Sequence, residues 1–402
     1  MVGAGGREHA LAVALARTAE VVVTPGNAGI DASVPAPPED LEADLYVVGP
    51  EAPLVDGLAD RLRARGATVF GPGADGARLE GSKAWMKEVA AAAGVPTAAH
   101  RAFDSGEVDA ALAFLCTLPG LYVVKTDGLA AGKGVLVTES LTEAEDDVRA
   151  KLSGAGFGDA GRRVVIEEGM SGPEVSLLCL CDGARAVPLP SAQDFKRADD
   201  GDAGPNTGGM GAYSPFAAVD AAEGEHLTER LVAPTLYELR RRGIDYRGVL
   251  YAGLMLTPEG PKLLEYNVRF GDPEAQVVLP RWTGDVAAVL TACASGSLRV
   301  QPTFSDAAAV AVVCASEGYP VAPRHGDVID GMEEAAAVPG AHVFCAGVAE
   351  DERGRLVTAG GRVLAVTGLG PTVADARVTA YRAVSAITWP GRHVRTDIAA
   401  GV

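Results

Sequence analysis

Two consecutive strands predicted within residues 247–274 constrain the fold of this chain more than any other segment. Apolar residues fill both alternating sets from Val249 to Leu256, so this strand is expected to be covered on both faces inside a sheet. A turn predicted at residues 257–261 (TPEGP) returns the chain as a second strand. That strand has one apolar and one polar face, so its polar side chains are expected to project together. The apolar set is Leu264, Tyr266, Val268 and Phe270, and the polar set is Glu265, Asn267 and Arg269.

The polar set favours a site for a metal ion and an anion. A solvated edge strand is the alternative, but the neighbouring strand has no polar face and Asn is unfavourable inside strands. Glu265 and Asn267 offer the oxygen ligands that Mg²⁺ takes together with phosphate oxygens. Arg269 could bind a carboxylate or phosphate through its guanidinium. We therefore interpret the second strand as the floor of a metal–nucleotide site.

Composition limits the class of protein. The 402 residues are 48% hydrophobic and 5% aromatic, which is typical of a multidomain α/β protein. The net charge of -18 argues against nucleic-acid or anionic-membrane binding. No apolar run reaches the roughly 18 residues that cross a bilayer, and the six cysteines form no CxxC pair and are expected to be reduced core residues. We expect a cytoplasmic protein, monomeric or dimeric.

The first 80 residues alternate strands with helices, which predicts a parallel sheet with ligands at the carboxyl ends of its strands. Residues 3–9 (GAGGREH) run into a helix, so they present backbone N–H groups and Arg7 at a helix N-terminus, which suits an anion. The glycine spacing and the later acid of a dinucleotide fingerprint are both missing. Two further turns, at residues 25–29 (PGNAG) and 50–53 (PEAP), follow predicted strands.

Residues 127–134 (DGLAAGKG) join two predicted strands. The segment is one residue shorter than a P-loop, has no Ser or Thr after Lys133, and leads into a strand. We interpret it as a flap whose backbone and Lys133 could close over phosphates, with an ordinary hairpin loop as the alternative. Lys83 lies in the first turn of a predicted helix, where the dipole disfavours a cation. It is a phosphate ligand or a solvated lysine.

Three further segments complete the pattern. The adjacent acids at 167–168 and the glycine-broken link after them suit a hinge that pairs with a flat base, with Glu174 near sugar hydroxyls. Residues 191–219 lack periodicity but carry charged side chains among five glycines, which favours an ordered substrate loop over disorder. From about residue 303 we expect a small α+β lobe without reactive clusters, which serves as a cover and packing partner.

A series of sequence runs resembles the phosphoribosylamine–glycine ligases (glycinamide ribonucleotide synthetases), which are ATP-grasp ligases of purine biosynthesis. In chain order and over nearly the whole length the runs are GGREHA, PGNAG, VVGPEAPLV, LEGSKAWMK, KTDGLAAGKGV, VIEE, GPNTGGMGAYSP and EYNVRFGDPE. The resemblance implies a multidomain α/β and α+β protein with an ATP-grasp fold. It implies an N-terminal Rossmann-like domain (1–80), an ATP-grasp region (81–302) with a mobile lid (103–170), and a C-terminal α+β lobe (303–402).

The resemblance also implies roles for individual residues. ATP would be bound by Lys83, Lys125, Gly132, Lys133, Gly134, Glu167, Glu168, Met170 and Glu174. Mg²⁺ or Mn²⁺ would be bound by Glu265 and Asn267. Glycine and 5-phosphoribosylamine would be bound by Gly5, Gly6, Arg7, Asn27, Pro50, Glu51, Asn206, Thr207, Gly208, Gly209, Arg269 and Asp272. Catalysis would involve Lys133, Arg269, Asp194 and Lys196.

The implied reaction activates the carboxylate of glycine with the γ-phosphate of ATP, and the sugar amine then attacks the acyl phosphate. Such chemistry needs a metal, fixed positive charge and exclusion of water, but no protein nucleophile. Two alternatives stay open: another ATP-grasp ligase that joins a different carboxylate and amine, and a nucleotide-binding regulator without catalysis. A dinucleotide-dependent oxidoreductase would require the missing fingerprint.

The chain departs from the family pattern near its N-terminus. Only Met1 and Val2 precede the first glycine turn, where the family has a full apolar strand. Between Gly29 and Leu45, three prolines argue against the helix and strand found in relatives. We therefore expect an abbreviated first domain whose sheet could lack its central strand.

Overall fold

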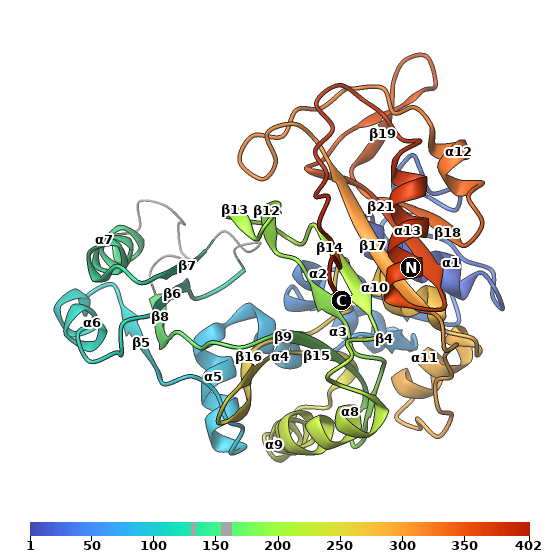
Figure 1. Cartoon of the computed structure of the whole chain (residues 1–402). Coiled ribbons are helices and arrows are strands. Elements are labelled where there is room, and N and C mark those ends of the chain that lie inside the picture. The colour runs from blue at the N-terminus through green and yellow to red at the C-terminus, as the bar shows by residue number, and fades with distance from the viewer. Residues whose placement is uncertain (130–133, 154–162) are drawn as a thin grey trace.

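The structure is a computed structural model that describes residues 1–129, 134–153 and 163–402. Figure 1 shows the lid standing out on one side of a larger body, with the C-terminal lobe at the top right. The predictions for Gly132 and Lys133 fall outside the described residues. Within those residues no helix is long and apolar enough to span a membrane.

The N-terminal sheet does contain its central strand, contrary to expectation. The two-residue strand β1 pairs in parallel with β2, while Val2 bridges Val48 beside β3. Gly49 N donates to Val2 O at 2.9 Å, and β3 pairs in parallel with β4. The strands are β1 (Val2–Gly3), β2 (Thr24–Pro25), β3 (Tyr46–Val47) and β4 (Val69–Phe70), and the helices are α1 (Gly6–Leu15), α2 (Glu51–Val55), α3 (Leu58–Ala64) and α4 (Ala74–Gly81). The proline-rich segment forms only a short 3₁₀ turn, Pro38–Asp40.

A four-stranded antiparallel sheet of order β10-β9-β15-β16 forms the centre of the body. Strand β15 is buried on both faces, as predicted: Leu250 and Leu254 pack in one core, and Val249 and Tyr251 pack in another. The strands are β9 (Glu174–Asp182), β10 (Ala186–Pro188), β15 (Arg247–Thr257) and β16 (Gly260–Asn267). The helices of this part of the chain are α5 (Lys83–Ala92), α8 (Ala221–Leu227), the π-helical turn η3 (Thr228–Val232), α9 (Ala233–Arg241), α10 (Ala275–Val278), the 3₁₀ turn η4 (Leu279–Arg281) and α11 (Val286–Ala294).

The hairpin of β15 and β16 contains an irregularity that strict alternation did not predict. Gly253 pairs with Glu265, but the next residue, Leu254, pairs with Leu263. The extra residue is Leu264, as in a β-bulge, which shifts the facing of the strand. As a result Leu263 is fully buried in the core, whereas Leu264 lines a cavity. Grouping Leu264 with Tyr266 and Val268 by strict alternation therefore missed the bulge, and Leu263 takes the core position instead.

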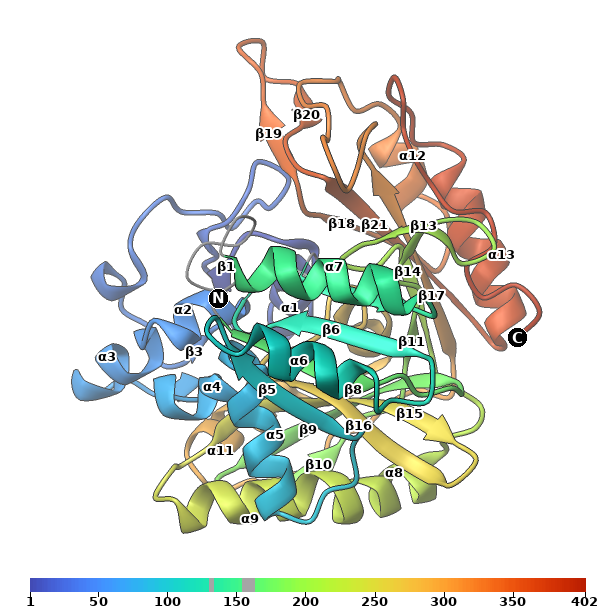
Figure 2. The ribbon, with the colours of Figure 1, turned by 90° about the vertical axis from the view of Figure 1, so that its left-hand side faces the viewer.

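The lid is a separate four-stranded sheet of order β5-β8-β6-β7 with its own apolar core. In Figure 2 the lid faces the viewer, and its two helices lie in front of its strands. The strands are β5 (His100–Asp104), β6 (Tyr122–Thr126), β7 (Val135–Thr138) and β8 (Arg163–Glu168), and the helices are α6 (Val108–Leu115) and α7 (Leu141–Leu152). Helix α5 leads from the body into this lid, and the residue that caps its N-terminus, Ser82, accepts a hydrogen bond from Trp85 N.

The segment 191–219 is ordered, and it joins the C-terminal lobe. Its strands β11 and β14 extend the sheet of that lobe, in the order β11-β14-β17-β21-β18. The segment holds β11 (Gln193–Asp194), β12 (Arg197–Asp199), β13 (Ala203–Asn206) and β14 (Gly211–Ser214). The lobe adds β17 (Ala308–Ala315), α12 (Met332–Ala336), β18 (Ala341–Cys345), β19 (Val348–Glu350), β20 (Leu356–Thr358), β21 (Arg362–Gly370) and α13 (Val373–Val384). All six cysteines are free thiols, and all but Cys116 are buried.

The bulge predicts unequal costs for two neighbouring substitutions. Leu263→Ala should lower the free energy of unfolding by about 2–5 kcal/mol, because it leaves a hole in a closed core. Leu264→Ala should cost about 1 kcal/mol or less, because that residue lines an open cavity. The melting temperatures of the two ligand-free variants measure the difference. Equal losses would contradict the register.

Candidate active site

A cavity of about 1090 Å³ lies where the lid, the central sheet, the 193–208 segment and the C-terminal lobe meet. Most of the predicted site residues line it, although they come from distant parts of the chain. They are Arg7, Glu51, Lys83, Lys125, Gly134, Glu167, Glu168, Met170, Glu174, Asp194, Lys196, Asn206, Thr207, Gly208, Glu265, Asn267, Arg269 and Asp272. The lining does not include Gly5, Gly6, Asn27, Pro50 or Gly209.

The three polar residues of β16 and its end share one side, as predicted. All three line the cavity, and Arg269 Nη2 donates to Asn267 Oδ1 at 3.2 Å. Among the described residues, no hydrogen bond or ion pair reaches the Glu265 carboxylate. Burial alone would raise the pKa of Glu265, but Lys196, Lys125 and Lys83 outweigh burial and lower it. Glu265 is therefore a charged carboxylate whose oxygen atoms accept no hydrogen bond from the described part of the chain.

Three lysines approach Glu265 from three different segments. Lys83 Nζ on α5 donates to Gly128 O at 2.9 Å, and Lys125 Nζ on β6 lies 2.9 Å from Glu167 Oε1. Lys196 Nζ contacts the carboxylate of Glu174. Burial lowers the pKa of Lys83, whereas for Lys125 the carboxylates of Glu167 and Glu265 overcome burial and raise the pKa. These three lysines thus place positive charge around Glu265 in an acidic protein.

Arg269 is not the open anion clamp that its position in the sequence suggested. Its Nη2 lies 2.7 Å from Glu80 Oε1, and its Nε lies 3.3 Å from Glu51 Oε2. Glu80, at the end of α4, also accepts from Val268 N at 2.8 Å. Sequence reasoning missed Glu80, because no local pattern distinguishes it from the other acids of the chain. A ligand carboxylate at Arg269 would have to share the guanidinium with these acids.

A second group of acids surrounds Lys196. Burial raises the pKa of Asp194 to about 7, Lys196 opposes this, and Glu274 and Glu174 add to it. Lys196 Nζ lies 3.9 Å from Asp194 Oδ1. Burial alone would lower the pKa of Lys196, but Asp194 and Glu174 outweigh burial and raise it. Glu274 Oε1 accepts from the Tyr251 hydroxyl at 2.6 Å. Asp194 is therefore a cavity carboxyl group that can hold or release a proton near neutral pH.

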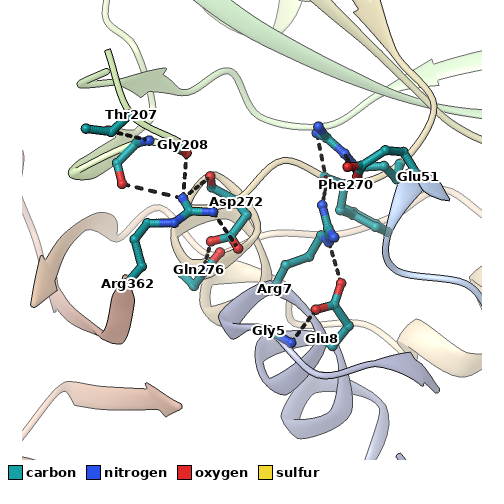
Figure 3. A network of polar contacts seen from close by, with 12 residues as sticks. Gly5, Arg7, Glu8, Glu51, Thr207, Gly208, Phe270, Asp272, Gln276 and Arg362 are labelled. Carbon is teal, nitrogen blue, oxygen red and sulfur yellow. Dashed lines mark hydrogen bonds and ion pairs between the residues drawn. The ribbon is translucent and has the colours of Figure 1, made fainter. Parts of the chain in front are cut away.

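The N-terminus of α1 is largely satisfied from within the protein (Figure 3). Gly5 N donates to Glu8 Oε2 at 2.6 Å, and Arg7 Nη1 donates to Phe270 O at 3.1 Å. The side chain of Asn27 is also occupied: its amide donates to Ala4 O at 2.8 Å, and its oxygen accepts from Gly29 N at 2.8 Å. The backbone of Asn27 is occupied as well, since its N–H donates to Ser33 Oγ at 3.1 Å and its carbonyl accepts from Ile30 N at 3.1 Å. Only the side chain of Arg7 reaches the cavity from this turn.

The C-terminal lobe contributes directly to the cavity, so describing it only as a cover was wrong. Arg362 on β21 forms an ion pair with Asp272, in which Nη2 lies 3.2 Å from Oδ2. Its Nη1 also donates to Asp272 O at 2.8 Å. The same guanidinium donates a hydrogen bond to Gly208 O, and Figure 3 shows it between Gly208 and Asp272. The Tyr319 hydroxyl accepts from Gly208 N at 3.1 Å. Arg362 begins an apolar strand, and nothing in that pattern indicates a partner 90 residues away.

Comparison with known proteins identifies the family. Models of the phosphoribosylglycinamide synthetase N domain, ATP-grasp (A) domain and C domain match residues 1–80, 81–275 and 309–401. The phosphoribosylamine–glycine ligase of Streptomyces coelicolor is 49% identical over 100% of this chain and 98% of its own length. The chain belongs to the phosphoribosylamine–glycine ligase family. The family inferred from the sequence runs is confirmed.

Two further relatives support this assignment to the ligase family. The enzyme of Xanthomonas campestris is 46% identical over 99% of this chain and 96% of its own length. The crystal structure of the Thermotoga maritima ligase superposes with a TM-score of 0.85 at 34% identity and covers 99% of each chain. The ATP-grasp fold with an N-terminal parallel sheet is therefore also confirmed.

The Asp194 carboxyl predicts a pH-dependent effect on stability. Its pKa is raised from 3.8 to about 7, so between these values the folded protein holds a proton that the unfolded chain has lost. Stability from this group therefore falls as pH rises through that window, and the cost is complete above pH 7. Asp194→Asn should melt at a higher temperature than the wild type at pH 8, and the difference should shrink toward pH 5. A difference that does not vary with pH would contradict the assignment.

Proposed function

We propose that the protein joins glycine to 5-phosphoribosylamine at the expense of ATP, giving glycinamide ribonucleotide, ADP and phosphate. The observation that carries this function is the Glu265 carboxylate, which is charged, free of protein partners among the described residues and surrounded by Lys83, Lys125 and Lys196. Membership of the ligase family supplies the two other substrates. The reaction runs through glycyl phosphate, which the sugar amine attacks.

Glu265 and Asn267 are proposed to hold the divalent cation, Mg²⁺ or Mn²⁺. One free carboxylate and one amide oxygen on the same side of a strand fit an ion that takes its remaining ligands from water and phosphates. No protein-only cage of three or more acidic, histidine or cysteine side chains occurs in the described ranges, which agrees with such a shared site. When bound, the ion neutralises charge on the phosphates. Asn267 Oδ1 has a second lone pair beyond its bond from Arg269.

The ATP phosphates are proposed to lie against Lys83 and Lys125, beside Gly134. Glu168 and Met170 line the cavity beside the lid strands and suit the base, and Glu174 suits the ribose. Glu167 acts through Lys125, since its carboxylate is turned onto buried lysines. Fixed ammonium groups stabilise developing phosphate charge without reorganising in the reaction.

Glycine and the sugar phosphate are proposed to occupy the opposite end of the cavity. Arg7, the Asn206–Gly209 segment and Asp272 would surround phosphoribosylamine, and Arg269 would orient the glycine carboxylate. Asp194, with a pKa raised to about 7, can take the proton that leaves the amine as it attacks. Before this transfer, Lys196 stabilises the ionised Asp194 carboxylate. Closure of the lid (103–170) would exclude water from the acyl phosphate.

We also propose the remaining features expected of such an enzyme. The protein works in the cytoplasm on small-molecule substrates, without nucleic acid or membrane partners, as a monomer or a dimer. Its domains are 1–80, 81–302 and 303–402. Strands β11 and β14 precede residue 303 but pair within the C-terminal sheet, so the last boundary is crossed by backbone hydrogen bonds.

The function predicts that ADP release depends on both glycine and phosphoribosylamine. A coupled ADP assay with each substrate omitted in turn measures this dependence directly. Equal turnover with other amino acids and without the sugar would indicate a different ATP-grasp ligase.

The metal role predicts that Glu265→Gln loses ligase activity while the fold is retained. Residues that merely support metal ligands cost about 10–100-fold when changed, so kcat should fall at least about 100-fold for a ligand itself. Glu259→Gln is the matched control, because Glu259 lies in the exposed turn of the same hairpin. Unchanged ADP production by folded Glu265→Gln would refute the metal role.

A further inference from the structure

A second lysine of α5 lies behind the cavity wall and has no part in the proposed chemistry. Lys87 follows Lys83 by one helical turn, but its side chain is only 1% exposed. Its ammonium group donates two hydrogen bonds of 2.7 Å, to Glu167 Oε2 on the lid strand β8 and to Thr97 Oγ1. Thr97 Oγ1 donates in turn to Leu263 O on β16 at 2.6 Å. A buried chain of polar contacts thus links the lid to the central sheet through Lys87.

Glu167 is shared between two lysines, one on each carboxylate oxygen. Lys87 takes Oε2, while Lys125 Nζ lies 2.9 Å from Oε1 and also lines the cavity. One carboxylate between two ammonium groups leaves one positive charge uncompensated within this group. With Lys125 alone, Glu167 would form a neutral pair as seen from the cavity.

We propose that Lys87 is a positioning residue for the phosphates of ATP. Lys87, on helix α5 of the body, binds Oε2 of Glu167 and fixes the position of this carboxylate. Glu167 in turn holds the Lys125 ammonium at the cavity through its other oxygen, Oε1. Because the charge of Lys87 balances that of Glu167, the positive charge of Lys125 remains available to a triphosphate. This inference rests on the proposed ATP site, and it concerns the phosphates rather than the base.

Stabilisation of the fold is a poor explanation for the two lysines. A buried ion pair contributes little net stability because desolvation offsets the attraction, and an excess buried charge adds a further cost. Both side chains of the Lys87–Glu167 pair are at most 2% exposed, so this cost applies in full. An anionic ligand at Lys125 would balance the excess positive charge. Ligand binding therefore explains the second lysine better than stability does.

The pH dependence of binding distinguishes a charge effect from a packing effect. Burial lowers the pKa of Lys87 to about 8; Glu167 and Glu265 raise it in opposition, and Lys125 lowers it further. The other hydrogen-bond partner of the Lys87 ammonium, Thr97, carries no charge. Lys87 therefore loses its charge as pH rises past about 8, and ATP should bind more weakly at pH 9 than at pH 7. An arginine at this position keeps its charge throughout this range.

The test compares the dissociation constants of ATP and adenosine by isothermal titration calorimetry, without glycine or sugar. Lys87→Met should weaken ATP binding roughly tenfold or more at pH 7, as expected for one unit charge removed across a partly buried dielectric, and leave adenosine unchanged. Lys87→Arg should bind ATP at pH 7 like the wild type and lose the decline toward pH 9. Lys151→Met is the matched control: Lys151 is a lid lysine, 3% exposed, that bonds Asp147 and Val124 O outside the cavity.

Three outcomes would overturn the proposal. Lys87→Met could bind ATP like the wild type, it could lose ATP and adenosine equally, or the wild type could fail to prefer ATP over adenosine. If Lys87→Met does not fold in a thermal melt, the comparison of wild type with Lys87→Arg between pH 7 and pH 9 decides alone. Because neither glycine nor phosphoribosylamine is present, a failure of the ligase function leaves this result readable.

Discussion

The Glu265 carboxylate is the charge on which the rest of the site depends. A buried carboxylate is costly unless positive groups compensate it. Here the compensation comes from Lys83 on α5, Lys125 on the lid and Lys196 on the 193–208 segment. Keeping Glu265 ionised therefore requires that these separate elements meet at one place. The same arrangement gathers the cations that a triphosphate needs.

Three of the cavity cations already have acidic partners within the protein. Lys196 pairs with Glu174, Arg269 with Glu80 and Glu51, and Arg362 with Asp272. Such pairs hold the side chains in defined positions before substrate arrives, which reduces the cost of ordering them later.

Periodicity predicted the central hairpin well, because burial on both faces of β15 and the polar side of β16 each leave a repeating signal. It failed at Leu264, where one extra residue changes the facing of the strand and no residue type announces it. The two-residue strand β1 was also missed, since two residues carry no periodicity.

The limits at the site have the same physical origin. Glu265, Asn267 and Arg269 could be grouped because they alternate along one strand, and the glycine-rich segments were visible by composition. Glu80, Lys87 and Arg362 could not be found, because their partners lie 80 or more residues away and are chosen by packing. Long-range ion pairs of this kind have no local sequence pattern.

The most direct test of this account is a crystal structure of the protein with ADP and Mn²⁺, in which anomalous scattering locates the ion. The account predicts an ion bound by the Glu265 carboxylate and Asn267 Oδ1 that also contacts the nucleotide phosphates. A nucleotide bound elsewhere, or an ion held without Glu265, would contradict it.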